Sequence, residues 1–294
     1  MQKKCFIILL ACLFLVFNLS YITASSIQSN QNKELEDVLS NSSQYCSKLA
    51  HAVLDFVCKE KVVIDFFTLG ESGTLSRIEV QSRGRQQEIG VESWRKQRKF
   101  KTQKLVYDYQ LVSKEFKLSE QRILLEVDGK KASNESNDIE RRFPHSLLIL
   151  GPIGLLSEYW QKRHDYKIKK KGRLFGEKTY VIEAVPKPEY ATEHLWGKVW
   201  ISQDDFSILK IEWNQESAKG YESLIQKAKQ QNLQPDFSLI AEYEYEKNGI
   251  RFPSKFVLKE NYKHPKYKLI KNSKKTVVYF DYKFFTVKTD VVVK

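Results

Sequence analysis

Glycine, proline and cysteine are scarce in this chain of 294 residues, which has 12 glycines, 7 prolines and 4 cysteines. These numbers are too low for a collagen-like, low-complexity or disulfide-dense protein. Apolar residues make up 41% and aromatic residues 13% of the sequence. The composition is therefore that of a globular protein long enough to bury a core of its own.

The sequence also lacks a recognisable catalytic or metal-binding motif. Its five histidines are scattered and form no HExxH pair. The segment "GESG" at 70–73 lacks the spacing of a nucleophile elbow, and "GRLFGEKT" at 172–179 is one residue short of a P-loop. We therefore expect no enzyme, no catalytic residue, no metal site and no cofactor.

Long apolar runs are absent except at the N-terminus, where Cys5 to Leu19 follow two lysines and precede small residues. This order predicts a secretory signal peptide over 1–24 rather than a transmembrane anchor. The residues Leu9-Leu10-Ala11-Cys12 are similar to a bacterial lipobox, so lipid attachment at Cys12 is a second interpretation. The sequence thus predicts an exported protein that is periplasmic or associated with the cell envelope.

Acidic residues are too few to balance the basic ones, because 49 Lys and Arg face 36 Asp and Glu, a net charge of +13. The excess favours anionic partners, either lipid headgroups or acidic envelope proteins. The basic run at 95–104 is where we expect an anionic membrane surface to dock. A solvated edge strand protected by lysines explains the run equally well. Nucleic acid is not an expected partner, because an exported protein rarely meets it.

Removal of the predicted signal peptide leaves two cysteines, Cys46 and Cys58. In an oxidising compartment an even pair predicts a disulfide. The residues between them have helical spacing, so the bond requires a helix that ends near Asp55 and a chain that folds back at once. Two free buried thiols are the alternative.

Runs of alternating apolar and polar residues dominate the chain from Gln103 onward and predict nine or ten strands joined mostly by tight turns. Asn248-Gly249 is the strongest hairpin signal. Helices are expected over 41–55, over 145–160 with a break at Gly151-Pro152, and over 216–231. The fold class is α+β, a curved antiparallel sheet. We expect a flexible segment over 25–40 and a single domain over 41–294.

Each predicted strand has one apolar and one polar face. The simpler interpretation is a sheet packed on its own helices. The alternative is an incomplete β-barrel around a hydrophobic cavity, with about three helices as its lid and 145–160 as a plug. The expected hinge of this lid is Gly151, Pro152 and Gly154. The residues expected to line the cavity and lid are Leu147, Leu148, Leu155, Leu156, Trp160, Val199, Ile201, Leu209, Ile211, Trp213, Tyr243 and Tyr245.

The hairpin "GKVWISQDDFSILKIEW", which begins at Gly197, resembles the outer-membrane lipoprotein carrier (LolA-like) superfamily. In that superfamily a "G-K-hydrophobic-W-I" strand runs through an acidic turn into an "I-L-K-I-E" strand. The early helix and the antiparallel strands extend the resemblance over about residues 103–290. It implies an incomplete β-barrel whose helices cover a hydrophobic cavity, used by relatives to hold acyl chains or to sense lipoproteins.

Two functions follow as expectations. The first is a non-enzymatic envelope protein that binds a lipid or a lipidated protein in a cavity of the sheet, for lipid or lipoprotein transport. The alternative is an envelope regulatory or assembly module that binds a protein partner with the same fold, its cavity filled by its own side chains.

Overall fold

The computed structural model describes residues 31–53, 56–68, 77–82, 85–90, 98–114, 117–132, 148–190, 196–218, 221–265 and 268–285. The predicted signal peptide, Cys12 and Leu147 lie outside these residues. Among the described helices, none is both long and apolar enough to cross a membrane.

One antiparallel sheet of eleven strands forms the body of the protein, in the order β6-β5-β4-β1-β15-β14-β11-β10-β9-β8-β7. Two further hairpins, β2–β3 and β12–β13, are sheets of their own. The strands are β1 (Phe56–Thr68), β2 (Arg77–Ser82), β3 (Arg85–Gly90), β4 (Arg98–Lys114), β5 (Lys117–Val127), β6 (Lys130–Lys131), β7 (His164–Leu174), β8 (Glu177–Pro186), β9 (Gly197–Ser202), β10 (Ile208–Trp213), β11 (Gln234–Glu242), β12 (Tyr245–Lys247), β13 (Ile250–Phe252), β14 (Lys255–His264) and β15 (Lys268–Phe284).

The helices are few, and most are short. The N-terminal helix, 31–52, begins earlier than the predicted 41, so residues 31–40 are helical where a flexible segment was expected. The other helical segments are η2 (Leu148–Leu150), α2 (Gly151–Leu156), α3 (Glu158–Gln161), η3 (Pro188–Tyr190), η4 (Gln215–Ser217) and α4 (Tyr221–Gln230). The predicted α+β class with a mostly antiparallel sheet is confirmed.

The strand register places one apolar row across the sheet. Val62 of β1 lies opposite Leu105 of β4 and Val277 of β15, and the row continues strand by strand to β8. We call these residues the apolar band, and all of them are buried. In sheet order they are Leu105, Val62, Val277, Phe256, Ala241, Ile211, Val199 and Ile182. The face that carries the band is the inner face of the sheet.

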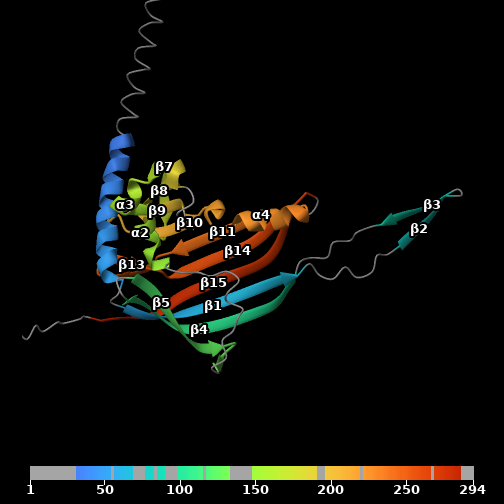
Figure 1. Ribbon diagram of the computed structural model, residues 1–294, viewed down its shortest axis with the longest axis horizontal. Coiled ribbons are helices and arrows are strands. Elements are labelled where there is room, and N and C mark those ends of the chain that lie inside the picture. Colours follow the sequence, from blue (N-terminus) through green and yellow to red (C-terminus); the bar gives the residue numbers. More distant parts are fainter. Residues whose placement is uncertain are drawn as a thin grey trace, which may run out of the picture.

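The N-terminal helix, α2 and α3 lie together at one side of the sheet, near β7–β10, while β1, β4 and β15 extend away from them (Figure 1). Val38 and Leu49 of the N-terminal helix and Val53 just after it join Leu155 of α2 and the apolar band in one hydrophobic core. The sheet therefore buries its inner face against these helices, as the apolar periodicity requires.

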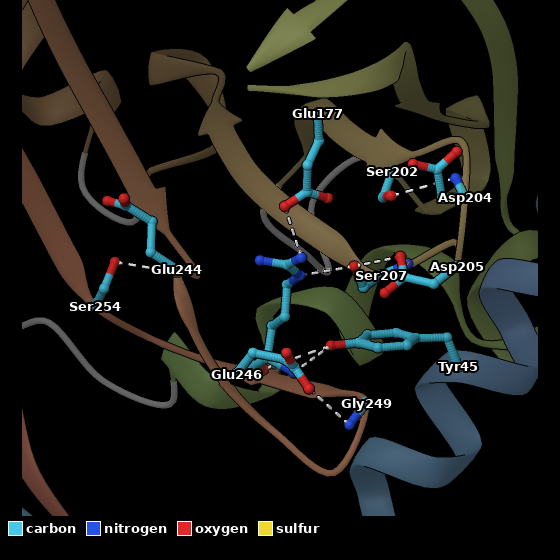
Figure 2. A network of polar contacts seen from close by, with 11 residues as sticks. Tyr45, Glu177, Ser202, Asp204, Asp205, Ser207, Glu244, Glu246, Gly249 and Ser254 are labelled. Atoms are coloured by element: carbon cyan, nitrogen blue, oxygen red, sulfur yellow. Dashed lines mark hydrogen bonds and ion pairs between the residues drawn. The ribbon is translucent and has the colours of Figure 1, made fainter. Parts of the chain in front are cut away.

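Tyr45 of the N-terminal helix, Glu177 and Ser207 point toward one another (Figure 2), and Arg251 of the β12–β13 hairpin binds all three. Its backbone N–H donates to the Tyr45 hydroxyl at 2.9 Å, its Nε to Ser207 Oγ at 2.8 Å and its guanidinium to Glu177 at 2.7 Å. Ser207 in turn donates to Asp205 at 2.6 Å. The acidic turn of the 197–213 hairpin thus holds the serine that binds Arg251.

Replacing Gly197 by alanine should weaken the sheet more than any surface change. A Cβ at this position would overlap the carbonyl oxygen of Glu212 and lie 2.9 Å from the Cα of Trp213, which are backbone atoms that cannot move aside. We expect Gly197→Ala to lower the free energy of unfolding by about 2–3 kcal/mol in urea denaturation. Gly172→Ala is the control, because its Cβ would meet nothing nearer than 3.9 Å. Equal effects of the two changes would contradict the packing described here.

Arg251→Ala should lower the free energy of unfolding by about 2 kcal/mol, because it leaves Glu177 and Ser207 without their common partner. Arg251→Lys keeps the positive charge but loses the planar guanidinium group that binds two partners at once. Its free energy of unfolding should therefore lie between those of the wild type and Arg251→Ala. Urea denaturation of the three proteins measures this. A lysine variant as unstable as the alanine variant would mean that the charge does not contribute.

Candidate functional site

The inner face beneath α2 brings together most of the residues expected to line a cavity. Leu148, Leu155 and Leu156 come from the segment 148–161, which we call the lid. All three are buried in the same core as the predicted residues of the sheet. Those residues are Val199, Ile201, Ile211, Trp213 and Tyr243.

The lid lies directly on the sheet at Gly151. A Cβ there would be 2.7 Å from the Tyr243 hydroxyl oxygen, 3.1 Å from Trp213 Cζ2 and 3.3 Å from Ile211 Cδ1. Glycine is therefore needed for this close approach. The inner face under the start of α2 is filled by the protein's own side chains.

Side chains from three parts of the protein hold the carbonyl groups of the lid. Tyr243, the residue after β11, donates to Leu148 O at 2.7 Å, and Cys46 of the N-terminal helix donates to Pro152 O at 3.3 Å. Tyr166 of β7 donates to Leu155 O at 2.5 Å. We call these three hydrogen bonds, together with the two made by Gln161, the clasp.

Gln161 completes the clasp from within the lid. Its side-chain amide donates to Leu156 O and to Leu39 O of the N-terminal helix, both at 2.7 Å. A helix as short as α2 is not stable by itself, and no side chain caps its N-terminus. The conformation of the lid therefore depends on the clasp and on its apolar contacts.

The predicted break of the lid at Gly151-Pro152 is wrong. Pro152 lies in the first turn of α2, where a proline's missing N–H has no partner to lose, and the helix is interrupted at Ser157 instead. Pro152 and Gly154 are buried. The role of Gly151, Pro152 and Gly154 as a hinge stays a prediction.

Three predicted lining residues lie elsewhere. A bulge between Ile208 and Lys210 puts Ile208 opposite Ile201, so Leu209 is buried outside the core and does not share the face of Val199. Tyr245 lies in β12, is 37% exposed and stacks on Tyr282 with ring centroids 4.4 Å apart. Trp160 of α3 is half-buried and contacts His164 edge-on.

The predicted disulfide is wrong, because Cys46 and Cys58 are both free and buried. The helix does end shortly before Asp55, at residue 52, but the two thiols form no bond. Cys46 lies in the helix with its thiol on Pro152 O, and Cys58 lies in β1, where the strand has already begun at Phe56. The alternative of two buried thiols is the one observed.

The inner face also carries a charged cluster that the sequence did not reveal. Arg122 of β5 donates from Nε to Glu60 of β1 at 2.6 Å and from a terminal nitrogen to Glu120 at 2.9 Å. Tyr109 of β4 donates to the other oxygen of Glu120 at 2.9 Å. Glu60 is fully buried. Burial alone would lower the pKa of Arg122, but the neighbouring Glu60 and Glu120 outweigh it and raise that pKa, so the guanidinium stays charged.

The only sequence signal for this cluster is Glu60 itself. In β1 it takes an inner position between Cys58 and Val62, where alternation calls for an apolar residue. In the sequence, its partners Glu120 and Arg122 look like ordinary residues on the polar face of a strand. Only the register between β1, β4 and β5 reveals that they meet.

A separate pocket of about 610 Å³ opens beside the start of the N-terminal helix. Its wall includes Glu34, Asp37, Val38, Tyr180 and Phe206, and none of the residues predicted from the sequence. Within the described part of the chain, no group of three or more His, Cys, Asp and Glu is placed to hold a metal ion.

No protein-family model and no curated protein matches the sequence. Solved structures do resemble the fold. A DUF1329 family protein from Desulfovibrio piger aligns over 87% of this chain and 95% of its own, with 9% identity and a TM-score of 0.37. A LolA superfamily protein from Nitrosomonas europaea aligns over 86% and 97%, with 12% identity and a TM-score of 0.33.

A third similar structure is a Vibrio parahaemolyticus domain named for outer membrane lipoprotein sorting. It aligns over 85% of this chain and 93% of its own, with 11% identity and a TM-score of 0.36. The structures that resemble this fold therefore include a member of the LolA superfamily, the family that the 197–213 hairpin suggested.

Both buried thiols should be unreactive in the folded protein. Burial raises the pKa of Cys46 to about 12 and raises that of Cys58 as well, so little thiolate forms at pH 8. We expect iodoacetamide to label the peptides of both cysteines only after denaturation without reductant, as read by mass spectrometry. A Cys46–Cys58 peptide that needs reductant before labelling would contradict the structure.

Proposed function

We propose that this protein is a non-enzymatic cell-envelope protein that binds a hydrophobic ligand, the acyl chain of a lipid or lipidated protein, between the lid and the inner face of the sheet. The chain is exported, and the ligand is carried rather than transformed.

The apolar band is the observation that supports this proposal. It crosses eight adjacent strands without a polar residue, about 34 Å along the curve at the usual strand spacing. An acyl chain that lies along such a surface gains about 0.8 kcal/mol for each buried methylene group. One chain of ordinary length is therefore enough for tight binding.

The lid supplies a means of entry. The clasp holds it by side-chain hydrogen bonds, each of which contributes only about 1 kcal/mol net, and α2 has no long regular helix to unfold. A ligand that enters from the lid replaces the contacts of Leu148, Leu155 and Leu156 with its own methylene groups. The structure described here is then the closed form.

A second function is supported by a different observation. The contacts at Gly151 fill the inner face under α2 with the protein's own side chains. This filling favours a regulatory or assembly module that binds a protein partner through its surface.

Native mass spectrometry of the chain expressed from its full coding sequence, followed by solvent extraction, separates the two functions. We expect a stoichiometric lipid or acylated peptide. Protein that carries none, and that also takes up no fluorescent fatty acid after delipidation, would overturn the binding of a hydrophobic ligand and leave the partner-binding module.

Loosening the clasp should speed ligand entry. Gln161→Ala removes the two hydrogen bonds that tie the lid to Leu39 and to its own end. We expect the uptake rate of a fluorescent fatty acid, measured by stopped flow, to rise about thirtyfold, the factor for a loss of about 2 kcal/mol from two hydrogen bonds.

Lys162→Ala is the matched control, because its exposed side chain pairs with the exposed Glu158 and, among the described residues, has no ion pair with the N-terminal helix or the sheet. Its uptake rate should stay at the wild-type value. If Gln161→Ala also leaves the rate unchanged, the lid is not the entrance.

A further inference from the structure

We propose that the free edge of β7 binds an acidic, extended segment of a protein partner, which adds to the sheet as a further strand. The edge meant here is residues 167–174, none of which takes part in the clasp. The inference therefore goes beyond the proposed function and does not depend on a bound lipid.

The edge of β7 is open to another chain. β7 is the last strand of the sheet (Figure 1), and among the described strands only β8 pairs with it. A strand in this position has one row of N–H and C=O groups without a strand partner. Residues 169–173 are all exposed to solvent. At the usual rise of a strand, 167–174 span about 26 Å, the length of an extended segment of eight residues.

The edge is also strongly basic. β7 contains one acidic residue, Asp165, and five basic ones, which are Lys167, Lys169, Lys170, Lys171 and Arg173. Lys169 binds Glu183 at 3.0 Å, and Lys171 binds Glu34. These two ion pairs leave three cations, more than Asp165 balances.

The three remaining cations have no acidic partner in the described part of the chain. Lys167 and Lys170 form no ion pair there, and Arg173 donates to a neutral acceptor, Gly176 O, at 3.2 Å. Side chains of an added strand would lie about 5 Å from those of β7, a distance at which opposite charges attract and like charges repel. The edge therefore favours a strand that carries carboxylates.

Protection of the edge does not by itself explain this charge. Lysines on an edge strand do hinder unwanted pairing, but that purpose does not require one sign of charge. β5, near the opposite edge of the sheet, has two basic and two acidic residues. The edge of β7 instead repels basic strands, a second copy of itself included. Main-chain hydrogen bonds would supply the affinity, and the basic row would select an acidic segment of another protein.

Fluorescence anisotropy of the full chain with a labelled octapeptide tests this inference. In the first peptide glutamate alternates with valine, and in the second peptide lysine replaces glutamate. We expect saturable binding of the glutamate peptide at low salt, at least about tenfold tighter than that of the lysine peptide. No binding of the glutamate peptide, or equal binding of both peptides, would overturn the inference.

A third peptide separates strand addition from simple charge attraction. It is the glutamate peptide with N-methyl groups on its central residues, which removes N–H donors from both of its edges and leaves its charges unchanged. We expect its affinity to be lower by about tenfold or more, because the main-chain hydrogen bonds are lost. An affinity equal to that of the unmethylated peptide would contradict strand addition.

Lys170→Glu reverses the charge of one unpaired cation. We expect it to weaken binding of the glutamate peptide about fivefold and to tighten binding of the lysine peptide. Lys229→Glu is the matched control, because Lys229 is exposed in α4 and undergoes the same change of charge. Its affinity for the glutamate peptide should stay within about twofold of the wild-type value. Equal effects of the two variants would place the binding outside β7 and overturn the inference.

Two further measurements keep this inference apart from other functions. Fatty-acid uptake should be the same in Lys170→Glu and in the wild type, so a failure of peptide binding leaves the proposed function intact. Phosphatidylglycerol vesicles that bind the wild type but not Lys170→Glu, together with no binding of the glutamate peptide, would assign the cations to a membrane surface and overturn the inference.

Discussion

The register of the antiparallel sheet is the constraint on which the rest of the structure depends. Because side chains alternate strictly along a strand, a shift by one residue would send a whole row to the opposite face. The pairing of β1 with both β4 and β15 joins strands that lie far apart in the sequence and fixes the rows on either side of β1. The apolar band and the charged cluster are neighbouring rows of this single arrangement. Gly197 allows β9 to approach the backbone of β10 closely, and the bulge in β10 changes which of its residues face inward.

The interior has two parts with different physical character. Toward β8–β11 the inner face is apolar and is covered by the lid and the N-terminal helix. Toward β1, β4 and β5 it carries buried carboxylates, a guanidinium group and tyrosine hydroxyls. Such a division is expensive for a protein that only needs a core, because buried charges stabilise less than well-packed apolar residues do.

Much of the fold could be predicted from alternation, since the hairpins after Gln103 and the turn at Asn248-Gly249 follow from local pattern alone. The same alternation correctly predicted that Val199, Ile211 and Trp213 share one face of the sheet. Leu209 was assigned to the wrong face because a bulge in β10 interrupts the alternation of side chains. Tyr245 was assigned to the wrong strand because β11 ends at Glu242. Neither feature has a recognisable sequence signal. The disulfide was misjudged because spacing says nothing of where a helix directs a thiol. The charged cluster depends on contacts between residues 62 positions apart, which no local pattern contains.

The position of the ligand is the central claim, and photo-crosslinking measures it most directly. A palmitic acid with a diazirine group near its end can be bound to the protein, irradiated and located by peptide mass spectrometry. We expect labels on Leu155 of the lid and on inner-face residues of the apolar band such as Ile211, and we expect them to be lost when unlabelled palmitate competes. Labels confined to the outer face, or unaffected by competition, would contradict it.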